Sequence, residues 1–159
     1  MDYIVKQLGM EYLDQVLVLV WKTFMEFEAP DYTQEGISFF RKEILDNEGF
    51  RESCKNGTNR MWGRLVQDTL VSVLVMRNKS HICLFFTDRE YQRRGIATGL
   101  FKQLVFESKG QFPKINEITV NSSPYGIPFY HHLGFEDLTS EQTVEGIRFV
   151  PMRYSLEDA

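Results

Sequence analysis

Residues 81–104 read HICLFFTDREYQRRGIATGLFKQL, and this stretch decides the fold. An apolar, β-rich run at 81–87 passes through a short polar turn and leads directly into an amphipathic helix. The start of a helix offers unpaired backbone N–H groups and the positive end of the helix dipole, so an anion placed there is stabilised. The order of strand, glycine turn and helix therefore predicts a phosphate-binding turn.

The residue types in this turn agree with that prediction. Gly95 and Ala97 keep the backbone bare, and Arg93 and Arg94 add positive charge without covering the N–H groups. A tight turn with two solvated arginines would have the same residues, so this segment alone leaves both interpretations open. Other phosphate loops fit worse, because the chain has no GxxxxGK[ST] motif and Gly99 is misplaced for GxGxxG.

Outward from the turn, the spacing of apolar residues divides the chain into further elements. Strands are predicted at 2–8, 60–66, 70–76, 81–87, 115–121, 135–139 and 146–155, and helices at 10–27, 33–46, 95–108 and 125–133. The polar stretch 47–58 holds two glycines without a sustained period and is predicted to be a loop. We expect one domain over residues 1–159, of the α/β (α+β) class, with a central mixed, largely antiparallel sheet flanked by helices.

The composition excludes several classes of protein. Of 159 residues, 43% are hydrophobic and 25% charged, which is typical of a folded globular chain. The net charge of -4 and the scattered basic residues do not fit a nucleic-acid binder. The longest apolar run, Val16–Trp21, is too short to cross a bilayer, and Asp2 stands where an export signal would be basic. We therefore expect a cytoplasmic protein without a nucleic-acid or membrane partner.

A second informative block, NSSPYGIPFYHHLGF, lies at 121–135. This block is similar to the FYxxxGF signature of the GNAT superfamily, and Gln92–Ala97 matches that family's pyrophosphate motif, (Q/R)xxGx(G/A). Together with the strand, two helices and meander upstream, the likeness covers nearly the whole chain. The resemblance implies the acyl-CoA N-acyltransferase fold, acetyl-CoA as co-substrate, and direct acetyl transfer to a primary amine in a ternary complex.

The resemblance also implies which residues bind acetyl-CoA. In this family the strand before the turn splays from the next strand, and the pantetheine arm lies in the gap along the backbone of Phe85, Phe86 and Thr87. The family often has Val where this chain has Thr87. Asn121 resembles a position that hydrogen-bonds the pantetheine, although turn chemistry accounts for it equally well. The remaining residues implied to bind the cofactor are those of the turn: Gln92, Arg93, Arg94, Gly95, Ile96, Ala97 and Thr98.

Tyr130 resembles the family's proton donor. A tyrosine with an ordinary pKa of about 10 is protonated at neutral pH and can reprotonate the departing thiolate. The alternative is that Tyr130 is a packed amphipathic aromatic. His131 and His132 point in different directions on a helix and lack metal-ligand spacing, so we expect both at the surface and no metal site.

The general base is not identified by the sequence, and three routes stay open: an amine that arrives neutral, deprotonation through water, and a protein carboxylate. Four carboxylates lie in the region that lines the acceptor site in this family, and each also fits a solvated surface position: Glu26, Glu28, Asp31 and Glu35. We expect acceptor specificity to be decided in this region and in the stretch 47–58. The acceptor itself stays open between a protein amino terminus, a lysine, a polyamine, an amino acid and an antibiotic.

Two other functions compete with direct acetyl transfer. Cys83 would act as an acyl-accepting nucleophile with His81 as its base, although a cysteine within an apolar strand is usually buried and inert. The non-enzymatic alternative is an acyl-CoA-binding sensor or interaction module with the same fold. Exposed strand edges are compatible with a homodimer, which is common in the family.

Overall fold

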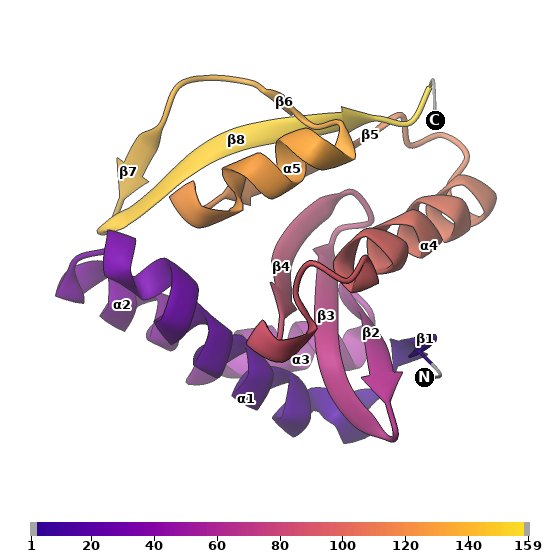
Figure 1. The fold of residues 1–159 in the computed structure, drawn as a ribbon, viewed down its shortest axis with the longest axis horizontal. Coiled ribbons are helices and arrows are strands. Elements are labelled where there is room, and N and C mark those ends of the chain that lie inside the picture. Colours follow the sequence, from indigo (N-terminus) through magenta and orange to yellow (C-terminus); the bar gives the residue numbers. More distant parts are fainter. Residues whose placement is uncertain (1–2, 158–159) are drawn as a thin grey trace.

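The computed structural model describes residues 3–157, which form a mixed sheet with helices on both faces (Figure 1). The eight strands follow the order β1-β2-β3-β4-β5-β8-β6, and β7 pairs with β8. The strands are β1 (Tyr3–Leu8), β2 (Asn59–Val66), β3 (Thr69–Arg77), β4 (His81–Thr87), β5 (Glu117–Ser122), β6 (Glu136–Asp137), β7 (Gln142–Val144) and β8 (Ile147–Ser155). Neighbouring strands are antiparallel except for β4 and β5, which are parallel. The predicted fold class is therefore confirmed.

The helical segments include several short 3-10 and π turns. The bounds are η1 (Met10–Tyr12), α1 (Leu13–Thr23), η2 (Phe24–Glu28), η3 (Ala29–Asp31), α2 (Gln34–Phe40), η4 (Arg41–Leu45), α3 (Glu48–Asn56), η5 (Arg89–Tyr91), α4 (Ile96–Gln111), η6 (Pro124–Gly126) and α5 (Ile127–Leu133). Thr33 caps α2 by accepting a hydrogen bond from the Gly36 N–H at 3.2 Å, and Gly134, with φ 107°, ends α5. Both caps were predicted from the sequence and are confirmed.

The predicted loop at 47–58 is wrong, because α3 occupies most of it. The Asn47 side chain accepts a hydrogen bond from the Phe50 N–H at 2.8 Å and caps the helix, and Gly57, with φ 90°, ends it. Phe50 is the one buried residue of α3 among the described positions. A single apolar anchor in nine residues produces no period, so the sequence pattern did not indicate a helix.

The strand predictions differ from the structure mainly at the two ends of the chain. The first strand was predicted to begin at Asp2, which lies outside the described residues. The strand expected at 135–139 shortens to β6, and β7, which was not predicted, forms a hairpin with β8. The three strands of the meander begin and end within one residue of their predicted bounds.

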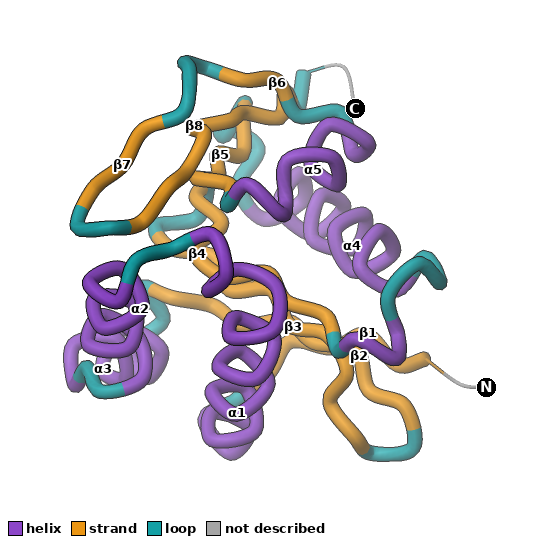
Figure 2. The backbone as a smooth tube through the Cα atoms, turned by 60° about the vertical axis from the view of Figure 1, so that its left-hand side comes forward, coloured by secondary structure: helices purple, strands orange, loops and turns teal. Residues whose placement is uncertain are grey.

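Two hydrophobic cores lie on opposite faces of the sheet (Figures 1 and 2). On one face α1, α2 and α3 cover side chains of β2, β3 and β4. On the other face α4 and α5 cover a core to which β2 to β5 and β8 contribute. Helices thus cover both faces of the sheet. A binding site is therefore expected where the strands end or separate.

The register between β3 and β4 contains a bulge. Val75 pairs with Leu84 and Met76 pairs with Ile82, so Cys83 has no residue opposite it. Cys83 and Leu84 consequently pack on the same face of the sheet, with the α1 core. A bulge bends its strand, and β4 pairs with β5 through Ile82 and its neighbour His81 before the two strands diverge. This divergence gives the gap that the resemblance predicted.

Candidate active site

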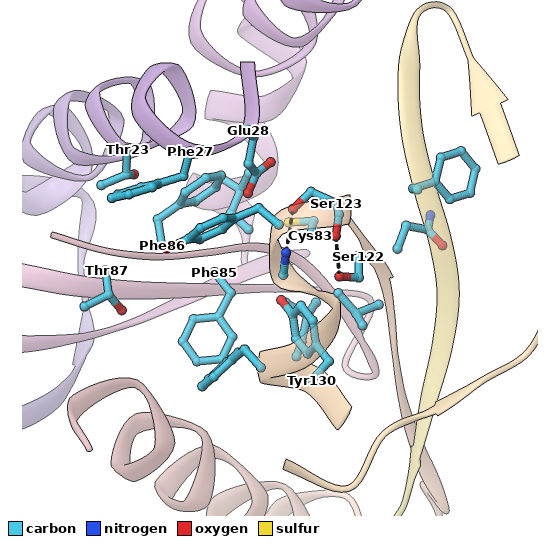
Figure 3. A pocket seen from close by; sticks show the side chains of 18 of the residues that line it. Thr23, Phe27, Glu28, Cys83, Phe85, Phe86, Thr87, Ser122, Ser123 and Tyr130 are labelled. Atoms are coloured by element: carbon cyan, nitrogen blue, oxygen red, sulfur yellow. Dashed lines mark hydrogen bonds between the residues drawn. The ribbon is translucent and has the colours of Figure 1, made fainter. Parts of the chain in front are cut away.

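A cavity of about 1260 Å³ occupies the gap between β4 and β5 (Figure 3). It begins at the turn before α4, passes between the two strands, and reaches the segment Thr23–Tyr32 and the β7–β8 hairpin. The residues around it therefore come from elements far apart in the sequence.

The turn before α4 presents backbone N–H groups to the cavity. Arg93, with φ 62°, and Gly95, with φ 77°, both have left-handed backbone conformations, and a Cβ atom added to Gly95 would meet nothing within 4 Å. The first helical hydrogen bond runs from the Gly99 N–H to the Gly95 carbonyl at 2.9 Å, so the N–H groups of the preceding three residues have no carbonyl to bond within the helix. The N-cap residue is Gly95, which has no side chain to cap this end. A bare helix start of this kind fits a diphosphate.

Nearly all the residues implied to bind acetyl-CoA line this cavity. They are Phe85, Phe86, Thr87, Gln92, Arg93, Gly95, Ile96, Ala97, Thr98, Asn121 and the catalytic candidate Tyr130. Arg94 is not among the lining residues, because its guanidinium group lies over the Tyr91 ring, 5.4 Å from the centroid. The Ile96 side chain is buried in a small core cluster, so Ile96 offers the cavity its backbone alone.

Hydrogen bonds at the end of β4 show which backbone groups point into the gap. The Gln92 amide donates to the Thr87 carbonyl at 3.0 Å, and its oxygen accepts from the Tyr125 hydroxyl at 2.9 Å. The Phe86 carbonyl instead accepts a hydrogen bond from the Ser72 hydroxyl of β3, at 3.3 Å. Since the direction of backbone groups alternates along an antiparallel strand, the N–H and C=O of Phe85 point to the gap as those of Thr87 do.

Tyr130 places its ring in the core and its hydroxyl at the cavity (Figure 3). The ring packs edge-on against Phe85, with centroids 6.3 Å apart, and against Phe135 at 5.2 Å. Burial raises the pKa of Tyr130 above its usual value, and the nearby charge of Glu28 raises it further. The phenol is therefore fully protonated at neutral pH.

Glu28 is the one carboxylate, of the four considered from the sequence, that lines the cavity. Burial raises its pKa to about 7, and the charge of Asp31 adds to the shift, whereas a hydrogen bond with the Ser123 hydroxyl opposes it. Figure 3 shows Glu28, Ser123 and Tyr130 around the same space. Glu28 is the last residue of the π turn η2. Such turns are frequent at functional sites. The sequence analysis did not predict this turn, because no residue pattern in the segment indicates one.

The other three carboxylates are engaged or point elsewhere. Glu26 lies 3.5 Å from the Arg89 guanidinium, and Asp31 lies 3.9 Å from that of Arg148. Glu35 is exposed in the first turn of α2.

The histidines and cysteines do not form a competing site. His131 and His132 are exposed, as predicted, and His131 bonds Asp137 at 2.7 Å. Burial raises the pKa of Cys83 to about 12 and lowers that of His81 to about 4, and His81 bonds the Thr119 hydroxyl at 2.8 Å. Such a thiol is a poor nucleophile at neutral pH. Among residues 3–157, no group of three or more His, Cys, Asp or Glu can hold a metal ion, and no helix is long and apolar enough to span a membrane.

The family model of the GNAT acetyltransferase domain matches residues 28–156. The chain belongs to the GNAT acetyltransferase family. This GNAT protein is 28% identical over 114 residues to the uncharacterized N-acetyltransferase YafP of Escherichia coli K12, a match that covers 72% of this chain and 67% of YafP. The family membership predicted from the two motifs is thus confirmed, and it implies acyltransferase activity with acetyl-CoA as acyl donor.

Solved structures of GNAT proteins share the whole fold. A GCN5-related N-acetyltransferase from Rhodopseudomonas palustris superposes with a TM-score of 0.82 at 17% identity, over 98% of this chain and 96% of that one. The PaiA N-acetyltransferase of Thermoplasma acidophilum, solved in complex with coenzyme A, gives 0.77 at 19% identity, over 98% and 99% of the two chains. At these identities the likeness establishes the fold alone.

Proposed function

We propose that this GNAT protein transfers the acetyl group of acetyl-CoA directly to a primary amine, with Glu28 as general base and Tyr130 as general acid. One observation carries the proposal: a carboxyl group with a pKa of about 7 and a protonated phenol line the same cavity, which begins at a bare helix start. An acid and a base with well-separated pKa values are what acetyl transfer to an amine requires.

The residues present fit acetyl-CoA. The N–H groups at the start of α4 and the Arg93 side chain would hold the pyrophosphate, and the backbone of Phe85 and Thr87 would bond the pantetheine arm as a further strand does. The coenzyme A complex of the PaiA protein, which has the same fold, supports this placement. Acetyl-CoA supplies a thioester whose carbonyl carbon is attacked by the amine. A β4 N–H aimed at the carbonyl oxygen would stabilise the negative charge that develops there.

Glu28 would take the proton that the amine must lose. An ordinary ammonium pKa near 10.4 lies about 3 units above that of Glu28, but burial of the ammonium in an apolar cavity lowers its pKa and narrows this difference. The neutral nitrogen then forms its bond to the carbonyl carbon as the carbon–sulfur bond breaks, and the further proton that this nitrogen loses on becoming an amide restores the phenol that has protonated the sulfur. The Ser123 hydroxyl accepts a hydrogen bond from the Gly126 N–H at 3.2 Å, which leaves its own proton to orient the Glu28 carboxylate.

Tyr130 would supply the proton to the departing sulfur. Its pKa is raised partly by the negative charge of Glu28. Once Glu28 has taken the proton of the amine, that charge is gone, so the phenol becomes a better donor at the moment the thiolate forms. The base and the acid would thus act in sequence.

Release of free thiol from acetyl-CoA, measured with a panel of primary amines, tests this function. Tyr130→Phe and Glu28→Gln should each lower kcat by about 10²- to 10⁴-fold and leave acetyl-CoA binding in place. The native rate should rise with pH through about 7, and Glu28→Gln should lose this dependence. Glu35→Gln, which changes an exposed carboxylate, serves as control. Binding of acetyl-CoA without thiol release from any amine would favour the sensor instead.

A further inference from the structure

The end of the cavity beyond Glu28 is walled by apolar side chains from two distant segments. They are Phe27 and Tyr32 before α2, and Val144, Ile147 and Phe149 of the β7–β8 hairpin. None of the five is fully buried, so their apolar surface stays uncovered inside the cavity. Uncovered aromatic surface in a concave site is typical of a binding site for an apolar group. We call this end of the cavity the acceptor end.

The Phe27 ring also stacks on Tyr125, with centroids 4.8 Å apart and an interplanar angle of 20°. Tyr125 precedes α5 and lines the cavity. The stacked pair therefore joins η2 to η6 beside Glu28, and it extends the aromatic wall from the acceptor end toward the reacting groups.

Glu28 is the carboxylate that lines the acceptor end, and the charges of Asp31, Glu141 and Arg148 also act on Tyr32 there. Among the described residues that line the cavity, the carboxylates are Glu28 and Glu43, and Glu43 is exposed on η4. The lining arginines are Arg93, in the phosphate-binding turn, and Arg77, at the far end of β3, and the histidines His81 and His132 also line the cavity. The hairpin cation Arg148 is already paired with Glu141 at 3.0 Å. Glu28 can therefore receive one positive charge, whereas Arg148, whose charge acts on Tyr32, is already held by Glu141 and Asp31.

A backbone contact joins α2 to the β7–β8 hairpin beside the acceptor end. Gly146, in the turn between β7 and β8, touches Gly36 of α2 so closely that a Cβ atom on Gly146 would lie 2.5 Å from the Gly36 nitrogen. Arg148 adds a hydrogen bond to the Asp31 carbonyl at 3.4 Å. Figures 1 and 2 both show the hairpin against α2. This contact narrows the way into the cavity between these two elements.

We infer that the acceptor is a small primary amine with a single positive charge and an aromatic or otherwise flat apolar body, bound between Tyr32 and Phe149 with its nitrogen at Glu28. The inference rests on the proposed function and names its substrate class. Aromatic faces bind both an apolar body and a nearby ammonium. A polyamine would place a second charge among these apolar side chains, an amino acid would place a carboxylate beside the carboxylate of Glu28, and a peptide entering between α2 and the hairpin would have to break the Gly36–Gly146 contact.

Thiol release from acetyl-CoA with matched amines tests the inference. We expect kcat/KM for 2-phenylethylamine to exceed by at least about tenfold the values for ethylamine, phenylalanine, spermidine and a lysine-containing peptide. Phe149→Ala should reduce the ratio of 2-phenylethylamine to ethylamine toward one. Phe106→Ala, which truncates a phenylalanine that is 74% exposed on α4, should leave the ratio unchanged. An acetyl-CoA-induced rise in melting temperature identifies variants that remain folded.

The outcomes separate this inference from the proposed function. A preference for spermidine, phenylalanine or the peptide, or a ratio that Phe149→Ala does not change, would overturn the inference and leave acetyl transfer intact. Acetyl-CoA binding with no thiol release from any of the amines would overturn the proposed function, and the inference with it.

Discussion

Glu28, the general base that we propose, lowers the stability of the fold when it is ionised. Its pKa is about 7 in the folded protein and near 4.5 in the unfolded chain, because the cavity disfavours the charged carboxylate. The folded state therefore binds more protons than the unfolded state between these pH values. The free energy of unfolding must then fall as pH rises through this range, and it stays reduced above pH 7.

Removing the charge should consequently stabilise the fold. We expect Glu28→Gln to raise the free energy of unfolding at pH 8 by about 1 to 3 kcal/mol, and to have little effect near pH 4.5, where Glu28 is protonated in the folded protein and about half-protonated in the unfolded chain. Urea unfolding at the two pH values measures the difference. Glu35→Gln should show no such pH dependence, and an equal effect of Glu28→Gln at both pH values would contradict a raised pKa in the folded state.

The sequence could not have singled out Glu28 from its three acidic neighbours. All four carboxylates lie within ten residues, in a segment without a motif. What distinguishes Glu28 is the π turn that ends at it and the enclosure of its carboxyl group by Ser123 and Tyr130, which lie about a hundred residues later. The Tyr130 position, by contrast, was indicated by the second motif, because local sequence fixes the short helix that carries it.

At the level of elements, the start of α4 has two roles that can be tested separately: it begins a helix, and we propose that it binds the phosphates of acetyl-CoA. Ala97 lies in the first turn of α4, where a negative side chain interacts favourably with the helix dipole but repels a phosphate. We expect Ala97→Asp to change stability by less than about 1 kcal/mol and to weaken acetyl-CoA binding by about 100-fold or more. Calorimetric titration with acetyl-CoA measures the effect. Gln103→Asp, which adds the same charge on the exposed side of α4, is the control, and similar affinities for the two variants would argue against a phosphate at this turn.

The bulge in β4 offers a second test at this scale. Deletion of Cys83 would leave Ile82, Leu84 and Phe85 in regular alternation between the two faces, so the strand can straighten without exposing its core residues. We expect a folded variant in which the gap to β5 narrows and acetyl-CoA binding is lost. Cys83→Ala keeps the bulge and should retain nearly full turnover, which also tests the thiol as a nucleophile.

Helices and strands whose apolar residues recur at regular spacing could be predicted from the sequence. Elements fixed by only a few residues could not. The meander strands and α4 have many apolar residues in register with their faces, whereas α3 is fixed by Asn47, Phe50 and Gly57. The sequence pattern also gave no sign of the bulge at Cys83, because residues 82–86 (ICLFF) are all apolar and any register would bury them. The gap was therefore expected from resemblance to a family, and its physical cause became apparent in the structure.

At the scale of the whole molecule, the cavity separates two parts of one sheet (Figure 1). β4 and β5 pair at His81 and Ile82, a shared core under α4 holds the same end together, and the contact of Gly36 with Gly146 joins the parts at the other end. Between these points a ligand that bonds β4 and the start of α4 would act as a missing strand. Acetyl-CoA should therefore stabilise the two parts as a unit.

Thermal unfolding and hydrogen exchange with acetyl-CoA test this expectation together. At 100 times its Kd, a ligand adds about 2.7 kcal/mol to the unfolding free energy, which corresponds to a rise of roughly 5 to 10 °C in Tm for a chain of this size. Amide protection should increase most in β4, β5 and the first turn of α4, and little in β1, none of whose described residues lines the cavity. A rise in Tm with protection confined to α4 would mean that the turn binds the phosphates while the strands stay apart. No rise at millimolar acetyl-CoA would remove the basis for acetyl transfer in this chain, whatever its fold.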